Sequence, residues 1–337
     1  MTQGSAGGAI ESVAKLLQSR RGRSPNVLVV GDAMLDRDCV VEPRLRRGDP
    51  VPVYRISETS HHLGGGGNVA DACAALGADV FFLGLAGKDE AGSKLRTLFN
   101  RREGLKFALV QQRHIKTTLK IRLQNAGHDV IRIDDENLLG DTQVMGVDNQ
   151  LLDELCASVA PSAIIFADYC KGVFQEKSSL SVLRSGRCGS YWRIAQTKRQ
   201  RLDLFSECDF IILNEGEALE AGAVAADMSR ACIFERVACR ALVVTRAERG
   251  VIAFLRTGES ISFPSLARHV VDVNGAGDCF TAGFSVALGL GAPVAESIAA
   301  GLLVAATRVE RGRNYDMMGS VLLSAPRPDH RLGDENE

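Results

Sequence analysis

The sequence contains no apolar run that approaches the ~20 residues needed to cross a bilayer, and its first 23 residues show no apolar segment followed by a cleavage site. It also lacks an excess of charge of one sign, since 40 basic residues balance 41 acidic ones for a formal net charge of −1. Nucleic-acid-binding and membrane-surface proteins favour a strong basic excess, so we expect neither partner. These absences favour a small-molecule partner and a cytoplasmic location.

Cysteines and histidines are present but show no pattern. The nine cysteines are scattered and include no C-x-x-C pair, so they indicate neither a disulfide framework nor a zinc site. The six histidines show no metal-ligand spacing. We therefore expect reduced thiols, which fits the cytoplasm, and we assign no chemistry to the histidines.

The sequence does contain enough apolar residues for a large core, and strand and helix patterns alternate along it. Its 337 residues, 45% of them hydrophobic, allow one or two domains at about 150 residues per domain. Short β-branched runs at 26–30, 163–166, 210–213 and 241–245 are separated by helical patterns. This alternation predicts an α/β fold, a doubly wound and mostly parallel sheet with helices on both faces. We expect the last four elements, a hairpin and two helices, at 250–255, 260–264, 276–290 and 293–308.

Two stretches with alternating polarity predict a small separate β-sheet. In the first, Pro50-Val51-Pro52-Val53, proline at alternate positions is compatible only with an edge strand. The second, 117–134, is interrupted by a hairpin-like turn at 125–128. Such a sheet must be covered, either by the active site or by a second subunit. The expected units are a lead-in at 1–25, a main domain at 26–325 with this β lid at about 38–60 and 112–134, and a disordered tail at 326–337.

The clearest chemical signal is the stretch Val271-Asp272-Val273-Asn274-Gly275-Ala276-Gly277-Asp278-Cys279-Phe280, between a β-branched run and a predicted helix. Its small residues let the backbone approach an anion, and the helix start directs N–H groups and its positive dipole end to the same place. Asp278 could there accept a proton from an attacking hydroxyl group. From these residues alone, a helix cap after a glycine turn is an equally good interpretation.

Two polar loops near other predicted strands also suggest ligand contacts. Asp32 and Asp36 follow the first strand four residues apart, which suits the vicinal hydroxyls of a polyol but is equally typical of a solvated turn. The run Gly64-Gly65-Gly66-Gly67-Asn68 precedes a helical pattern and brings the backbone close to a neighbour.

Two further loops follow the predicted strands of the second half. Asn214-Glu215-Gly216-Glu217 could place Glu217 on Mg²⁺ or its water, or could simply form a helix N-cap. The stretch from Thr245 to Gly250 could contact a nucleotide phosphate, or could only link a hairpin.

Taken in order and spacing, these motifs resemble the ribokinase-like (PfkB) carbohydrate kinases over about residues 26–325. If Asp278 only capped a helix, the other motifs would not be expected. The resemblance therefore favours Asp278 as a catalytic base. Several stretches are similar to the bacterial D-glycero-β-D-manno-heptose 7-phosphate kinases. These stretches are Gly31 to Arg37, Pro50 to Val53, Thr118 to Arg122 with Arg132 to Asp134, Asp168-Tyr169-Cys170-Lys171-Gly172, and Thr245 to Gly250.

The resemblance implies a role for each motif, together with ATP and Mg²⁺ as cofactors and a homodimer formed through the β lid. Asp278 is the implied catalytic base, and the amides of Gly275, Ala276 and Gly277 are its anion hole. Many members of the family use a monovalent cation beside this anion hole, which implies K⁺. The implied sugar-binding residues are Asp32, Asp36, Gly64, Gly65, Gly66, Gly67, Asn68 and Asp168. The implied nucleotide-side residues are Asn214, Thr245, Gly250, Asp272 and Glu217, the last near Mg²⁺ through water.

The resulting hypothesis is that Asp278 deprotonates the anomeric hydroxyl of D-glycero-D-manno-heptose 7-phosphate, which then attacks the γ-phosphorus of ATP in line. Lys120, Arg122 and Lys171 are the candidate partners of the 7-phosphate, although such residues are often only solvated lid charges. One alternative is a related kinase for another sugar or a nucleoside. A second is a non-catalytic sugar-phosphate sensor, which the intact Asp278 argues against.

Three departures from the heptose kinase pattern lie on the predicted sugar side. Arg44 to Pro50 stands where a Ser-Pro-Glu-Ala-like stretch is usual, Cys170 stands where glycine is common, and Gln196-Thr197-Lys198 replaces an Asp-Pro-Lys-like segment. The phosphoryl chemistry is therefore better supported than the identity of the sugar. No nucleotidyltransferase pattern follows the kinase motifs, and we expect a monofunctional enzyme.

Overall fold

The computed structural model describes residues 24–44, 51–112, 115–137, 149–174 and 191–312. Several predictions fall elsewhere in the chain. The tail at 326–337, most of the lead-in at 1–25 and the helix expected after the strand at 163–166 lie outside the described residues. The same holds for most of the departure that begins at Arg44.

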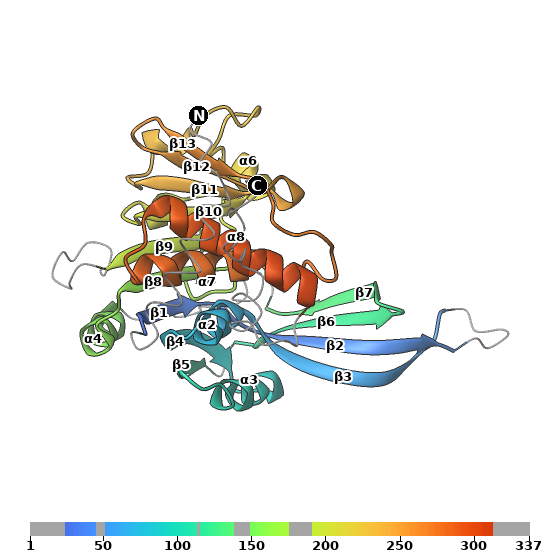
Figure 1. Cartoon of the computed structure of the whole chain (residues 1–337). Coiled ribbons are helices and arrows are strands. Elements are labelled where there is room, and N and C mark those ends of the chain that lie inside the picture. The colour runs from blue at the N-terminus through green and yellow to red at the C-terminus, as the bar shows by residue number, and fades with distance from the viewer. Residues whose placement is uncertain (1–23, 45–50, 113–114, 138–148, 175–190, 313–337) are drawn as a thin grey trace, which may run out of the picture.

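Among the described residues, nine strands form one sheet in the order β13-β12-β11-β10-β9-β8-β1-β4-β5 (Figure 1). All neighbours from β11 to β5 run parallel, whereas β12 and β13 form the predicted antiparallel hairpin at one edge. The strands are β1 (Asn26–Gly31), β4 (Asp79–Gly87), β5 (Leu105–Gln112), β8 (Ala163–Asp168), β9 (Trp192–Thr197), β10 (Phe210–Asn214), β11 (Ala241–Thr245), β12 (Val251–Leu255) and β13 (Ser260–Phe263).

Helices cover both faces of this sheet, because alternate residues of a strand point to opposite sides. On β1, Val27 and Val29 join the core beneath one helical layer, and Leu28 and Val30 join the core on the other face. Complete burial of each such side chain contributes about 1.5–3 kcal/mol. The first layer contains α2 (Gly66–Ala75), α3 (Glu90–Asn100), α7 (Ala276–Gly289) and α8 (Val294–Arg311), and the second contains α4 (Asn149–Val159) and α6 (Glu215–Glu220). The doubly wound α/β prediction is confirmed. Among the described residues, no helix is long and apolar enough to span a membrane.

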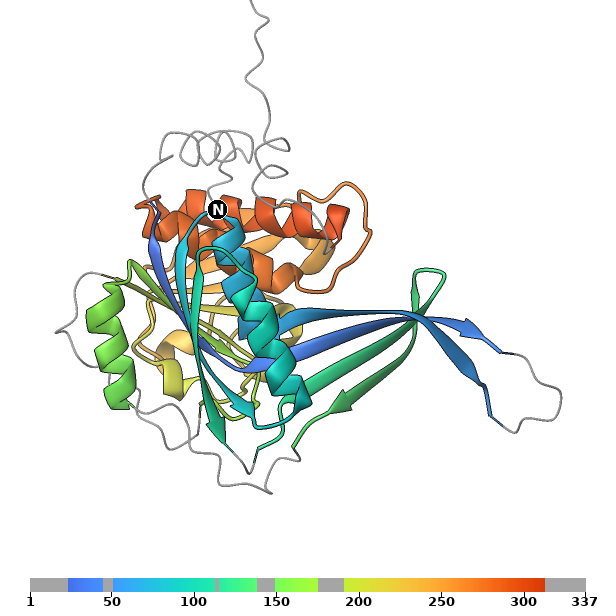
Figure 2. The ribbon, with the colours of Figure 1, turned by 90° about the horizontal axis from the view of Figure 1, so that it is seen from below.

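The predicted lid is a second sheet of four strands in the order β3-β2-β6-β7, and it projects from the main sheet (Figures 1 and 2). Its strands are β2 (Ala33–Pro43), β3 (Tyr54–Gly65), β6 (Thr118–Asn125) and β7 (His128–Asp135). The hairpin turn between β6 and β7 lies at Ala126 and Gly127, as predicted, and both residues have positive φ angles.

The boundaries of the lid differ from the prediction. The loop expected from Gly31 to Asp36 is reduced to Asp32, and the next residue already begins β2. Asp32 and Asp36 are 1% and 5% exposed, so the solvated-turn interpretation is wrong. The stretch at 105–112, for which no element was predicted from the sequence, forms β5 of the main sheet.

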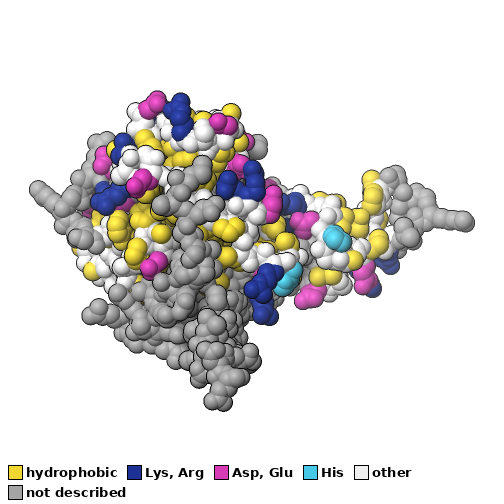
Figure 3. Space-filling model, turned by 45° about the horizontal axis from the view of Figure 1, so that its top comes forward, with side chains coloured by type: hydrophobic (Ala, Val, Ile, Leu, Met, Phe, Trp, Pro, Cys, Tyr) yellow, Lys and Arg dark blue, Asp and Glu magenta, His cyan; other side chains and the backbone are white. Residues whose placement is uncertain are grey.

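The two faces of the lid have opposite character. Asp36 pairs in register with Lys120, and Asp38 with Arg122, so charged side chains share one face. On β6 and β7 the intervening positions are apolar, and Ile131 and Ile133 of β7 are 43% and 46% exposed. Figure 3 shows such hydrophobic side chains along the projecting lid. The polar face lines a pocket against the main domain, whereas Leu35, Leu63 and Leu119 of the opposite face pack into the core with α2 and α3.

Candidate active site

A pocket of about 250 Å³ lies where the lid meets the carboxyl ends of the main-sheet strands. The strand order proceeds from β1 to β4 and β5 on one side, and the chain then returns to add β8 and β9 on the other side of β1. Such a switch point is where α/β sheets bind ligands. The pocket is lined by Met34, Asp36, Gly65, Asn68, Lys120, Arg122, Arg132, Tyr169, Gln196, Lys198, Ile212, Leu213, Asn214, Glu217, Thr245, Val273, Asn274, Gly275, Ala276, Gly277 and Asp278.

Asp278 stands in the first turn of α7, and its carboxylate accepts hydrogen bonds from three other segments. Asn68 Nδ2 donates to Oδ2 at 2.6 Å, and Gln196 Nε2 donates to Oδ1 at 2.9 Å. The Tyr169 hydroxyl also donates to Oδ1. Burial beside Asp278 raises the pKa of Tyr169 well above its ordinary value, which keeps that phenol a donor. The helix-cap interpretation of Asp278 is not seen, because the cap position is Gly275 and no side chain caps α7.

The start of α7 supplies backbone donors beside this carboxylate. Gly275 has a φ of 79°, and a β-carbon there would lie 2.7 Å from Asn68 Nδ2, so only glycine fits. Within the described residues, the N–H groups of Gly275 and Gly277 have no protein acceptor, whereas that of Ala276 donates to the Val273 carbonyl at 3.2 Å. Two of the three amides of the predicted anion hole are therefore available to a ligand.

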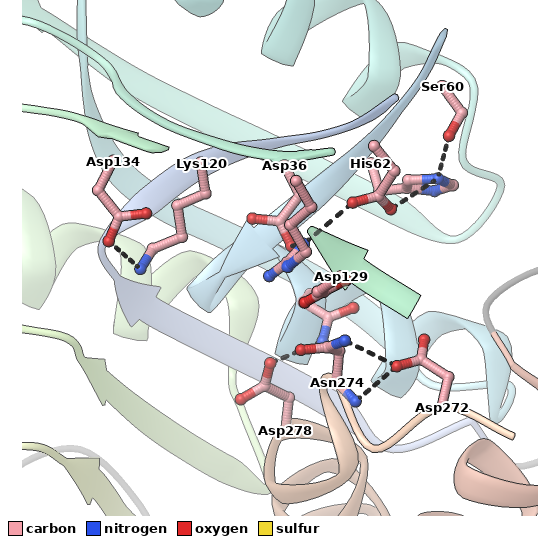
Figure 4. Close-up of polar contacts among 12 residues, drawn as sticks. Asp36, Ser60, His62, Lys120, Asp129, Asp134, Asp272, Asn274 and Asp278 are labelled. Atoms are coloured by element: carbon pink, nitrogen blue, oxygen red, sulfur yellow. Dashed lines mark hydrogen bonds and ion pairs between the residues drawn. The ribbon is translucent and has the colours of Figure 1, made fainter. Parts of the chain in front are cut away.

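A buried ion pair supports the same loop from behind. Asp272 Oδ1 accepts hydrogen bonds from the Asn274 backbone at 2.9 Å and from its side chain at 2.8 Å. Asp272 Oδ2 accepts one from Arg308 Nη2 at 3.0 Å. These hydrogen bonds and the charge of Arg308 lower the pKa of Asp272 despite its partial burial. Figure 4 shows Asp272, Asn274 and Asp278 close together, with lid residues Asp36 and Lys120 nearby.

The lid contributes cations to the pocket, and two of them are paired with lid carboxylates. Arg122 Nη1 lies 3.2 Å from both Asp36 and Asp38, and the Arg122 and Asp36 side chains are only 7% exposed. Lys120 Nζ lies 3.4 Å from Asp134. Arg122 is therefore not a solvated lid charge.

For two cations near the lid, the structure differs from the prediction made from the sequence. Lys171 pairs with Glu136 at 2.7 Å and does not line the pocket. Arg132, which the sequence did not single out as a phosphate ligand, does line it and has no ion-pair partner among the described residues. Arg132 on β7 pairs in register with Arg122 on β6, so both side chains lie on the face of the lid that lines the pocket.

Asp32 and Asp168, both predicted to bind sugar, lie behind the pocket wall and organise it. Asp32 accepts backbone N–H groups from Tyr169, Lys171 and Val173 at 2.7, 3.1 and 3.0 Å, which fixes the turn that carries Tyr169. Burial, together with the charge of Asp168, raises the pKa of Asp32 to about 6. Asp168 itself binds Arg199 and Thr197.

On the nucleotide side, Asn214 and Glu217 form a reciprocal capping box at the start of α6, with both hydrogen bonds at 2.8 Å. The N-cap interpretation of this motif is therefore confirmed. Both residues also line the pocket, and burial raises the pKa of Glu217. Thr245, at the end of β11, lines the pocket as well.

Gly250 and three of the four consecutive glycines do not line the pocket. A β-carbon on Gly250, whose φ is 81°, would lie 2.2 Å from the Phe263 carbonyl, so this glycine serves the β12 to β13 packing. Gly65 reaches the pocket, but Gly66 and Gly67 pack against the core, and Gly64 lies beside Asp36.

The sequence reasoning missed Tyr169, Gln196 and Lys198 as pocket residues. Tyr169 stood inside a stretch used only for resemblance, and the other two stood in a departure from it. Within the described residues, no group of three or more His, Cys, Asp or Glu side chains could hold a metal ion.

Comparison with known proteins places this geometry in context. The profile of the pfkB family carbohydrate kinases matches residues 24–318. The bifunctional protein HldE of Caulobacter vibrioides is 30% identical over 309 residues, which cover 88% of this chain and 62% of that protein. HldE of Nitrobacter winogradskyi is 32% identical over 278 residues, which cover 79% and 56%. The chain thus spans about three fifths of the length of these relatives.

Solved structures share the fold. A carbohydrate kinase from Agrobacterium tumefaciens superposes with a TM-score of 0.68 at 22% identity, covering 90% of this chain and 98% of that one. Phosphofructokinase-2 from Escherichia coli in complex with potassium gives a TM-score of 0.69 at 16% identity, covering 90% and 100%. These similarities confirm the ribokinase-like arrangement of sheet, helices and lid.

Proposed function

We propose that this chain, which belongs to the pfkB family of carbohydrate kinases, phosphorylates the anomeric hydroxyl of D-glycero-D-manno-heptose 7-phosphate. The product would be the 1,7-bisphosphate, a precursor for nucleotide-activated heptose. The observation that carries this choice of sugar is the cationic lid face over Asp278. Lys120, Arg122 and Arg132 there face the same pocket as the base. Lys120 and Arg122 are paired with lid carboxylates, but Arg132 has no ion-pair partner among the described residues, so this face offers a cation that can bind a phosphate on the sugar.

The chemistry follows from the hydrogen bonds around Asp278. This carboxylate takes the proton of the sugar hydroxyl as its oxygen forms a bond to the γ-phosphorus, and the bond to ADP breaks. Tyr169, Gln196 and Asn68 hold the carboxylate in place, so little reorganisation precedes proton transfer. The free amides at the start of α7 stabilise the negative charge on the transferred group.

ATP and Mg²⁺ fit the other side of the pocket. Thr245, Asn214 and Glu217 lie at the ends of β11 and β10, where a nucleotide would meet the anion hole. Glu217 is the carboxylate available to hold a water of Mg²⁺, which neutralises phosphate charge when bound. A monovalent cation beside the anion hole does not fit these residues, because Arg308 already pairs with the carboxylate of that loop.

The distal phosphate would be bound by Arg132 and Lys120. Arg132 has no carboxylate partner among the described residues, so it can pair with a phosphate without losing an ion pair. Lys120 is held at 3.4 Å by the half-exposed Asp134, a contact that a phosphate can replace. Arg122, locked between Asp36 and Asp38, would instead orient those carboxylates towards sugar hydroxyls.

The exposed apolar face of the lid supports a homodimer. Ile56, Ile131 and Ile133 are 55%, 43% and 46% exposed on this sheet, and pairing two lids would cover them. We place the enzyme in the cytoplasm, where its nucleotide co-substrate is available.

The proposal is tested by measuring ADP release with a panel of acceptors. Heptose 7-phosphate should be used with a kcat/KM at least a hundredfold above that for ribose, fructose, nucleosides and unphosphorylated heptose. Preference for one of the other acceptors would overturn the sugar assignment while leaving the kinase intact. Turnover that is equal in the wild type and in Asp278→Asn would instead support a sugar-phosphate sensor.

A further inference from the structure

Arg308 is a buried cation directly behind the anion-hole loop. It lies in the last turn of α8, and its side chain is 4% exposed. Its ion-pair partner is Asp272, at 3.0 Å. A β-carbon on Gly275 would lie 3.8 Å from Arg308 Nε, so the guanidinium is next to the loop on which the phosphoryl group is bound.

We propose that Arg308 supplies, as a fixed part of the chain, the positive charge beside the anion hole, so that phosphoryl transfer by this enzyme does not require K⁺. This inference rests on the kinase function but not on the identity of the sugar.

Coordination chemistry at the loop supports the proposal. A monovalent cation needs several oxygen ligands, yet both oxygens of Asp272 already accept hydrogen bonds, one of them from Arg308. The Val309 carbonyl at the adjacent helix end accepts the N–H groups of Val271 and Asp272, at 2.9 and 3.1 Å. The Asp272 carboxylate and the Val309 carbonyl therefore already accept hydrogen bonds from protein donors.

The charge of Arg308 argues in the same direction. Its Nη1 is buried and has no hydrogen-bond partner in the described part of the chain, so the guanidinium is not fully neutralised by its surroundings. A second cation placed beside it would be repelled in a region of low dielectric constant. A phosphate on the far side of the loop would be attracted by the same field, without the entropic cost of binding a free ion.

The first experiment compares turnover of the wild type in 100 mM KCl and in 100 mM choline chloride at equal ionic strength, with whichever acceptor the enzyme uses. We expect the two rates to agree within twofold. Activation by KCl of tenfold or more would overturn the proposal. A lack of turnover with heptose 7-phosphate alone would concern the sugar and not this inference.

The second experiment uses Arg308→Met, with Arg311→Met as the matched control because Arg311 is exposed on the same helix. In choline chloride, Arg308→Met should lower kcat at least tenfold, Arg308→Lys should retain most of it, and the control should be unchanged. Adding KCl should restore part of the Arg308→Met rate through the released Asp272 carboxylate. A full rate for Arg308→Met without K⁺ would contradict the proposal.

Two readouts need no acceptor sugar. The melting temperature of Arg308→Met should rise by several degrees more in KCl than in choline chloride, because an ion that binds only the folded state stabilises it. The wild type should show no such difference. Affinity for a non-hydrolysable ATP analogue should follow the same pattern by calorimetry. A K⁺-specific rise in melting temperature for the wild type would overturn the proposal even if Arg308→Met does not fold.

Discussion

The anion-hole loop and the lid bring charge to the same pocket in different ways. In the loop, Asp278 and Asp272 are held by partners from several distant elements. In the lid, cations are paired mainly with carboxylates of neighbouring lid strands. The loop is thus preorganised for one chemical step, whereas the lid can exchange internal ion pairs for contacts with a ligand. The comparison predicts that loop substitutions reduce kcat and lid substitutions raise KM.

The largest effect is expected from Asp278→Asn. Removal of the general base should lower kcat by about 10³-fold, since general base catalysis is worth roughly 10²–10⁴-fold. The affinity for ATP should change little, because the loop amides remain. Steady-state kinetics and calorimetry would measure the two quantities. A variant that keeps more than a tenth of the wild-type kcat would contradict the view that the loop, unlike the lid, determines kcat.

The lid should respond most strongly to Arg122→Met. This change leaves Asp36 and Asp38 without their shared cation in a buried site, and loss of one partner of a buried pair costs about 3–5 kcal/mol. The free energy of unfolding in urea should fall by that amount, and the KM for the sugar should rise. Arg55→Met, at a side chain that is 67% exposed, is the matched control and should change neither. An unchanged KM would remove the lid from substrate recognition.

The turn between the two regions should show a pH-dependent stability that comes from Asp32. Its pKa is about 6 in the folded protein, above the ordinary 3.8, so folding favours the protonated form. Stability from this group is present at low pH and is lost as pH rises from about 4 to 6. The shift corresponds to about 3 kcal/mol. From pH 4 to pH 7, the wild type should therefore lose stability relative to Asp32→Asn, by an amount of the order of 3 kcal/mol in the free energy of unfolding.

A difference that stays constant across this pH range would show that Asp32 is ionised equally in the folded and unfolded chains. Circular dichroism at several pH values in urea would provide the measurement. Asp79→Asn, at an exposed strand start, supplies a control for general effects of charge.

The smallest of these effects is expected at Gln196. Gln196→Ala removes one hydrogen bond from Oδ1 of Asp278, and a hydrogen bond to a charged group is worth about 1.5–3 kcal/mol. We expect kcat to fall by about tenfold or somewhat more, with little change in KM, because Asn68 and Tyr169 still hold the base. Gln200→Ala, at an exposed position, should have no effect. A selective rise in KM would assign Gln196 to the sugar instead.

Features that depend on local sequence were the ones that could be predicted. The β-branched runs gave correct strand positions, and the small-residue segment after Asp278 gave α7 and α8 within three residues at each end. The role of the loop at 272–278 could also be inferred, because its glycines, helix start and carboxylate are consecutive.

Features that depend on distant contacts were not predicted. The partners of Asp278 are Asn68, Tyr169 and Gln196, which lie 210, 109 and 82 positions away in the sequence. Arg308 stands in the last turn of α8, beside Glu310 and Arg311, and belongs to no motif. Asp32 was predicted to bind sugar, but it is buried behind the pocket wall. Its burial beneath a turn cannot be read from a Gly-Asp pair that is also typical of exposed turns.

The most direct test of the central claim is ³¹P NMR of the products formed from ATP and D-glycero-D-manno-heptose 7-phosphate. The account predicts a second sugar phosphate resonance coupled to the anomeric proton, appearing together with ADP and absent with Asp278→Asn. A spectrum in which heptose 7-phosphate stays unchanged while the wild type phosphorylates another sugar would contradict the assignment.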